Sequence, residues 1–371
     1  MVLYGYTVGD TDSDPNTAGT QFEVYRFRVD PFNPTPLFVG RIPALNSQNN
    51  DLEGLGTNPS TGRVSAVNEA RASVSTTLPN PTIDPDVVVV NNIDVTFAPQ
   101  IKSVSNGLIT RSSLPANPPN NPPNPPINVF RFGFDSGADF GRDTSSTGTI
   151  LSTNVLYNIS GNDTTSNGVP VGSSLYKIPG VTTGTGVTTL IDRFGTATTT
   201  AQIQGSAPTN PGKFADGLAI DNLNPGRTRA FASDFDNLDD VAGDTTRNNL
   251  YKVDLFTGEL SAPIVLRNPP NPSNPSAPPV PLNLNQDSGL AFTNAITSTS
   301  PTQRLLALLE NGQVYEITGY QDEHDAPGLT LGTATGVNGA GFATARLLGT
   351  VNLPNASSGA TDYEGFTIVN E

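Results

Sequence analysis

Three aspartates near the start of the chain occupy alternate positions of an expected turn. Asp10, Asp12 and Asp14 lie in the stretch Gly-Asp-Thr-Asp-Ser-Asp-Pro-Asn. Calcium loops use this spacing, because hard oxygen ligands must converge on one cation. The full EF-hand pattern is absent, since no Gly stands at its sixth position and no Glu at its twelfth. Two interpretations stay open, a calcium site and a solvated acidic hairpin loop.

A second acidic cluster lies further along the chain and has a higher density of carboxylates. Its members are Asp234, Asp236, Asn237, Asp239, Asp240 and Asp244. Without a cation, these carboxylates would repel one another. Calcium is therefore the cofactor that the sequence suggests, on charge density alone.

An acidic residue also recurs where successive strands are expected to begin. The set comprises Asp51, Glu53, Asp216, Asp287, Asp362 and Glu364. In a ring-shaped fold these acids could face a central channel and bind a metal, or act as general acid and base. Alternatively, each acid accepts hydrogen bonds from backbone N–H groups of its turn and locks adjacent repeats. We favour the structural role, because a catalytic residue is needed once whereas this acid recurs in nearly every unit.

Other catalytic chemistry finds little support. His324, the single histidine, stands among acids in Gln-Asp-Glu-His-Asp, and we expect it to be a solvated loop residue. No Gly-x-Ser-x-Gly motif is present to pair with it in a serine hydrolase. The chain has no Cys, which excludes thiolate catalysis, and only four lysines, which argues against a phosphate-binding cradle. No catalytic residue is predicted.

The candidate residues are distributed over a repeating all-β pattern. The chain holds 36 Gly and 33 Pro, and its short apolar runs alternate with small or polar residues, as in strands that bury one face. The acid–Gly starts recur roughly 70 to 90 residues apart, at 51–55, 137–141, 216–219, 287–290 and 362–366. Three further strand-like segments follow most starts, and the third strand of the unit usually carries a tyrosine. Four antiparallel strands per repeat predict the blade of a β-propeller.

The two ends of the chain complement each other. The last start is followed by a single strand, at 365–369, whereas three strand-like segments, 3–8, 23–29 and 37–42, precede the first start. Pairing of the C-terminal strand with these segments would complete one blade and remove exposed sheet edges. We therefore predict one closed propeller domain, 1–371, with about five four-stranded blades.

The blade count depends on residues 70–129. Strands are expected at 86–90 and 93–97, but the tyrosine-bearing element is missing, so six blades stay an alternative. Two Pro/Asn-rich tracts, 115–128 and 268–283, interrupt the pattern. Their prolines cannot complete a hydrogen-bond ladder and favour extended polyproline II loops. Each tract is either a stiff surface loop or a strap that lies on a neighbouring subunit.

The net charge excludes some classes of partner, and the composition indicates the compartment. With 19 Lys+Arg against 34 Asp+Glu, a net charge of −15 repels phosphate backbones and anionic lipids. Neither nucleic acid nor membrane insertion is therefore expected. The low lysine content and the abundance of Asn, Thr and Pro are typical of secreted or surface-displayed bacterial proteins, which predicts an extracellular or cell-surface location. No signal peptide is visible at the N-terminus.

Parts of the repeat resemble a known group of proteins. The start at 51–55, the turn at 58–63 and the element at 250–259 are similar to repeats of secreted bacterial β-propeller proteins. That group includes the esterase-like phytases and uncharacterised cyanobacterial surface propellers. The resemblance covers about four of five units and implies a fold rather than an activity. Phytase-type propellers combine carboxylates that bind calcium with several Lys and Arg residues that bind phosphate. This chain has too few basic residues to fill those phosphate-binding positions, so the resemblance assigns no catalytic residue here.

These features together predict a non-enzymatic extracellular structural or adhesive protein, a candidate subunit of a self-assembling surface layer or filament. Its expected partners are further copies of itself, other surface proteins or glycans. Two alternatives stay open. One is a calcium-dependent hydrolase of the phosphoesterase type. The other is a glycan-binding propeller, which the absence of Trp and an aromatic content of 7% weaken.

Overall fold

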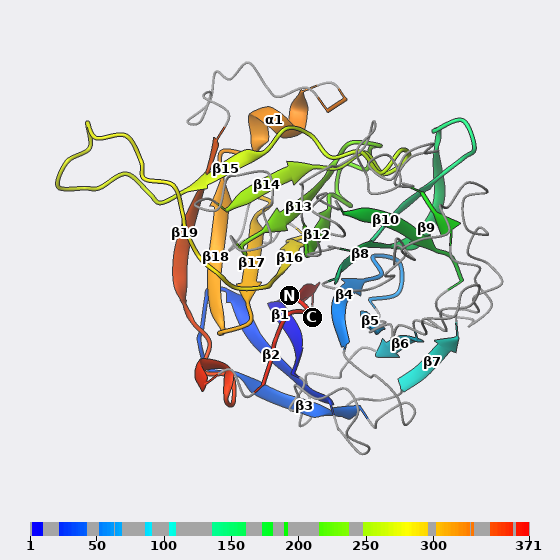
Figure 1. Ribbon diagram of the computed structural model, residues 1–371. Coiled ribbons are helices and arrows are strands. Elements are labelled where there is room, and N and C mark those ends of the chain that lie inside the picture. The colour runs from blue at the N-terminus through cyan, green and yellow to red at the C-terminus, as the bar shows by residue number, and fades with distance from the viewer. Residues whose placement is uncertain are drawn as a thin grey trace, which may run out of the picture.

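The computed structural model is a ring of twisted β-sheets around a central axis (Figure 1). The structure describes residues 2–9, 22–42, 52–62, 64–68, 86–90, 104–108, 136–160, 173–180, 189–191, 215–236, 248–295, 302–326, 328–329, 342–358 and 361–370. Within these residues, strands are interrupted by one short α-helix, α1 (Gln321–Asp325), and a 3-10 turn at Ala356–Ser358. None of the described helices is long or apolar enough to cross a lipid bilayer. The all-β prediction is confirmed.

Two blades come mainly from the N-terminal part of the chain. The first consists of β20 (Thr367–Asn370), β1 (Leu3–Gly9), β2 (Phe22–Asp30) and β3 (Leu37–Ile42), in that spatial order. The second consists of β4 (Leu52–Thr57), β5 (Val64–Asn68), β6 (Asp86–Val90) and β7 (Val104–Leu108). Neighbouring strands within both blades are antiparallel.

Three further blades follow in chain order. The third consists of β8 (Ser136–Thr144), β9 (Ile150–Ser160), β10 (Ser174–Ile178) and β11 (Thr189–Leu190). The fourth consists of β12 (Gly217–Ile220), β13 (Ala230–Asp234), β14 (Asn249–Lys252) and β15 (Ile264–Arg267). The fifth consists of β16 (Ser288–Phe292), β17 (Leu305–Leu309), β18 (Gln313–Thr318) and β19 (Phe342–Thr350). The fourth and fifth blades are also joined at their outer edges, where β15 and β19 pair in parallel.

The ends of the chain close the ring as predicted. β20 pairs antiparallel with β1, with Tyr4 opposite Val369 and Gly5 opposite Ile368. Both termini lie close to the axis in Figure 1. The C-terminal strand therefore becomes the innermost strand of the first blade, and closure replaces two open sheet edges with backbone hydrogen bonds.

The described strands fall into five groups of four. Residues 70–129, on which the blade count depended, supply β6 and β7, the two outer strands of the second blade. The strand expected at 86–90 is β6. The strand expected at 93–97 and the Pro-rich tract at 115–128 lie outside the described residues.

Glycines let the inner strands of neighbouring blades approach closely at the axis. Each acid–Gly start contributes one, namely Gly54, Gly137, Gly217, Gly289 and Gly365. A Cβ at Gly54 would lie 2.9 Å from the Cβ of Ala138 in the third blade, and one at Gly289 would overlap the backbone of Phe366 in the first. The space where these strands meet is too tight for a water molecule. The blades therefore close on one another through backbone contact at this point of the axis.

The hydrophobic core is divided among the interfaces between blades. The tyrosines of the third strands, Tyr176, Tyr251 and Tyr315, are buried in it. At the junction of the fifth and first blades, Phe27 stacks on Phe366 within the first blade, with ring centroids 5.9 Å apart, and both pack in one cluster with Leu306 and Leu308 of the fifth. Because each core segment joins two blades, the strands that carry the candidate acids are held rigidly relative to one another.

Candidate functional site

Two groups of acids lie at blade junctions, and the first group, two acids at strand starts, joins blades. Asp139 accepts a hydrogen bond from the N–H of Ile220 in the fourth blade at 2.7 Å. Asp216 accepts one from the N–H of Ser288 in the fifth blade, also at 2.7 Å. Each carboxylate also accepts from the N–H of the residue that follows it. These are the locking hydrogen bonds that the structural interpretation of the strand-start acids predicts.

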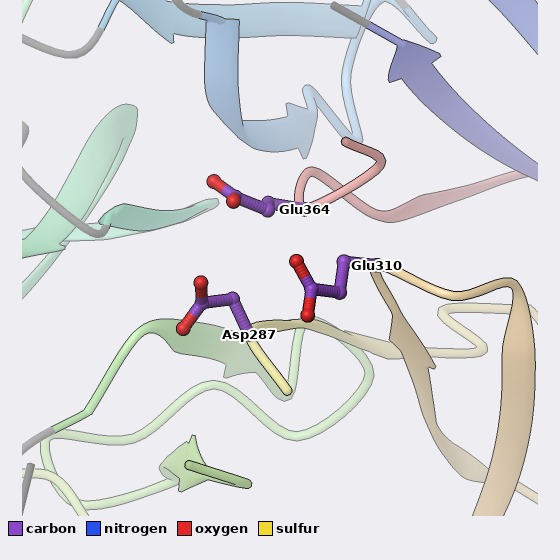
Figure 2. Close-up of side chains that lie close together, drawn as sticks. All are labelled: Asp287, Glu310 and Glu364. Atoms are coloured by element: carbon purple, nitrogen blue, oxygen red, sulfur yellow. The ribbon is translucent and has the colours of Figure 1, made fainter. Parts of the chain in front are cut away.

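The second group forms a cluster of carboxylates. Asp287, Glu310 and Glu364 each bring one carboxylate oxygen to within 4.8 Å of the other two. All three side chains are half-buried. Figure 2 shows that they come from three separate segments and lie around one small space. Oxygen ligands of one Ca²⁺ ion lie 2.3 to 2.6 Å from it, so they are at most about 5 Å apart. The spacing of the three oxygens therefore suits one calcium ion.

Two strand junctions position this cluster. Asp287 immediately precedes β16 and Glu310 immediately follows β17, so the antiparallel pairing of these strands places them side by side. The N–H of Glu310 donates to the backbone oxygen of Asp287 at 3.1 Å. Glu364 precedes β20, and its backbone packs against Gly289 of β16. The cluster therefore spans the junction between the fifth blade and the first, where the ring closes.

The electrostatics of the cluster disfavour a full set of negative charges. Burial, together with the charges of Asp362 and Asp236, raises the pKa of Glu310 to about 7. A divalent cation would remove this repulsion, whereas a proton on Glu310 relieves it in part.

The structure describes only two of the residues that the sequence proposed as calcium ligands. Asp234 is buried at the end of β13, and Asp236 forms a bridge with Asn285 in the approach to the fifth blade. Asp236 is close enough to Glu310 to affect its pKa, which connects it to the cluster at the ring junction. The others, Asp10, Asp12, Asp14, Asp239, Asp240 and Asp244, lie outside the described residues.

Glu310 was not selected from the sequence. It is the first residue of the turn Glu310-Asn311-Gly312, in which Gly312 has φ +83°. The signal available was indirect, since the apolar run before it and the Asn-Gly turn mark a hairpin. Antiparallel pairing places the residue that follows β17 beside the residue that precedes β16. That inference needs the pairing of β16 with β17, which local sequence does not specify.

The expectation of a solvated His324 is wrong. Its side chain is buried in α1 against Phe231 and Phe292, with ring centroids 5.2 and 5.7 Å away. Nε2 lies 3.6 Å from Oδ2 of Asp221, which is itself buried. Lys252 fastens the same helix by donating to the backbone oxygens of Glu323 and Ala326. The acids that flank His324 in the sequence gave no indication of this aromatic pocket, which β13 and β16 supply.

This burial makes stability depend on pH. Burial, helped by the charge of nearby Arg229 and opposed by Asp221 and Asp325, lowers the pKa of His324 to about 4. The unfolded chain binds a proton near pH 6.5 that the folded chain takes up only near pH 4, so stability is lost as the pH falls through this window. We expect this residue to contribute a loss of about 3 kcal/mol between pH 7 and pH 4.

The measurement is urea denaturation at several pH values for the wild type and His324→Gln, which cannot titrate there. The variant should show a shallower decline in stability on acidification. Parallel pH profiles for the two proteins would contradict a neutral buried His324.

No known protein family matches the chain, and no curated protein does. The solved structures similar to it include the following two. The periplasmic gluconolactonase PpgL of Pseudomonas aeruginosa has 14% identity and a TM-score of 0.31, over 94% of this chain and 68% of that one. Sqt1 of Saccharomyces cerevisiae has 12% identity and a TM-score of 0.28, over 80% of this chain, which spans about half (55%) of Sqt1. Similarity at this level assigns no activity and no ligand to the chain.

Proposed function

We propose that this chain is a non-enzymatic structural or adhesive protein that works outside the cytoplasm and binds calcium where its ring closes. The observation that carries the proposal is the carboxylate cluster of Asp287, Glu310 and Glu364. Two of these acids belong to the fifth blade and one to the segment that leads into β20. A cation bound by all three would join the last blade to the first and act as a structural clamp.

The spacing of the cluster favours a clamp over catalysis. Its three carboxylate oxygens lie within 4.8 Å of one another. A single ion needs only such converging oxygens, whereas a substrate would need room between the carboxylates. Calcium outside cells is abundant enough for sites of modest affinity, which use few carboxylates. An extracellular scaffold of this kind would have further copies of itself, other surface proteins or glycans as partners.

Calcium is expected to raise the melting temperature of the wild-type protein, and a chelator to reverse the effect. A ligand at 100 times its Kd stabilises a fold by about 2.7 kcal/mol. At pH 8, Glu310→Gln should affect the melting temperature differently with and without calcium. Without calcium it should melt at or above the wild-type temperature, because it removes a charge that the fold disfavours. With calcium it should lose most of the stabilisation.

Asp287→Asn is expected to weaken calcium binding in the same way, as measured by isothermal titration calorimetry. The matched control is Asp143→Asn, which removes a partly exposed acid paired with Lys177 at 2.8 Å in the third blade. The control should bind calcium like the wild type. An unchanged calcium response in the double variant Asp287→Asn/Glu310→Gln would mean that any bound calcium is held elsewhere, and the clamp would be refuted.

A calcium-dependent hydrolase is the second candidate, and one observation favours it. Burial and the neighbouring carboxylates raise the pKa of Glu310 to about 7, so a protonated acid stands next to Asp287 near neutral pH. Pairs of carboxyl groups with separated pKa values serve as general acid and base in hydrolases. A screen of phosphoester and glycoside substrates, repeated with Asp287→Asn, discriminates the two functions. If the wild type is active and Asp287→Asn is not, the hydrolase function holds and the structural proposal is rejected.

A further inference from the structure

The Pro/Asn-rich tract after β15 forms an arm that leaves the body of the ring (Figure 1). Residues 268–276 are all exposed, as is Val280, at 67%. Residues 268–281 include seven prolines, and residues 268–286 carry no charged side chain. In a chain of net charge −15, this uncharged segment can approach a second copy with little repulsion.

The arm is held in one shape by its own hydrogen bonds. At its base, the N–H of Asn268 donates to the backbone oxygen of Val280 at 2.9 Å, and Arg267 donates to that of Pro279 at 3.2 Å. Arg267 also lies over the ring of Phe342, 4.6 Å from its centroid, which fixes the base to β19. Near the tip, the N–H of Asn274 donates to the backbone oxygen of Asn271. A segment ordered before it binds loses little conformational entropy on docking.

A surface of matching chemistry lies on the first blade. Leu37 and Phe38 of β3 are 41% and 47% exposed, and the ring of Phe38 meets that of Tyr25 edge-on at 5.6 Å. Among the described strands, β3 is an outer strand that pairs only with β2. Proline-rich segments dock on exposed aromatic rings, and their carbonyl groups accept hydrogen bonds from the partner.

We propose that the arm, residues 268–281, docks on the Leu37/Phe38 face of β3 in a second copy of this chain. The arm leaves the ring at the junction of the fourth and fifth blades and points outward, whereas its docking surface belongs to the first blade. Each copy carries both this arm and this docking surface. The contact is therefore head-to-tail, and it propagates into a filament or closes into a larger ring. This inference rests on the proposed structural role and names the partner.

The absence of cysteine in the chain allows a direct test. Ser276→Cys places a thiol on the arm, and Leu37→Cys places one on β3. Mixing the two single-cysteine proteins under mild oxidation should give a disulfide-linked heterodimer. The matched control mixes Ser276→Cys with Leu223→Cys, a site of similar exposure (37%) in the fourth blade. Equal cross-linking to Leu37→Cys and Leu223→Cys would overturn the proposal.

Sedimentation velocity over a hundredfold range of concentration provides the second readout. The wild type should associate, and Phe38→Ser or replacement of 271–278 by two glycines should weaken association at least tenfold. Leu223→Ser should associate like the wild type. A wild type that is monomeric at every concentration, or arm and Phe38 variants that associate as strongly as the wild type, would refute docking of the arm. Sedimentation is run both with calcium and with chelator, so that loss of association through the arm can be told apart from loss of the calcium clamp. Melting experiments test the clamp independently.

Discussion

Gly365→Ala is expected to lower the free energy of unfolding by about 3 kcal/mol or more, at the upper end for overpacked cores. Gly365 precedes the closing strand of the first blade. A Cβ there would overlap both the backbone oxygen of Glu53 and the side chain of Leu55 in the second blade. Because the backbone of an inner strand cannot rotate away as a side chain can, only movement of a blade relieves the overlap. The urea midpoint measures the effect.

Gly226→Ala is the matched control for this substitution. Its added Cβ would meet Cγ of Arg229 at 3.0 Å, in a side chain rather than in backbone. We expect a smaller effect, about 1 kcal/mol, because this side chain can shift slightly while it keeps its ion pair with Asp221. If the two variants unfold at the same urea concentration, backbone contact between the first and second blades does not limit stability.

Asp216→Ala is expected to destabilise the protein by about 3 kcal/mol, because two buried backbone N–H groups lose their acceptor. Those groups belong to Gly217 and to Ser288 in the fifth blade. The matched control is Asp143→Ala, in which a partly exposed ion pair with Lys177 is lost. A pair of this kind contributes at most about 1 kcal/mol. Equal destabilisation by the two substitutions would show that Asp216 does not lock the blades.

The pH dependence of the Asp216 lock has a definite sign. Burial raises the pKa of Asp216 to about 8, although hydrogen bonds from Ser288 and Gly217 oppose the shift. The folded chain therefore holds a proton that the unfolded chain releases near pH 4, and this contribution to stability falls as the pH rises from about 4 to 8. Asp216→Asn, which keeps one acceptor, should cost less than Asp216→Ala and should flatten the profile over this range. A profile as steep as that of the wild type would indicate that Asp216 is ionised in the folded protein.

The positions of the strands and the closure of the ring were readable from local sequence. A short apolar run bounded by turns marks a buried strand, as in β17, where all five residues are buried. The unmatched strand at the C-terminus indicated its own partner, because an open ring leaves unpaired backbone groups at its edges. The glycine of each acid–Gly start was visible as a repeat, although its reason, contact with the next blade, is a property of the ring.

The site depended on tertiary structure. Glu310 is followed by an ordinary turn, and only the pairing of β16 with β17 brings it to Asp287, while packing of the first blade on the fifth adds Glu364. His324 stands among acids in the sequence, yet Phe231 and Phe292 from two other strands bury it. The acids with calcium-like spacing are close neighbours in sequence, whereas the cluster that the structure assembles comes from segments far apart in the chain. Spacing along a chain reports only neighbours in sequence, and the convergence of carboxylates or the burial of an imidazole depends on which blades meet.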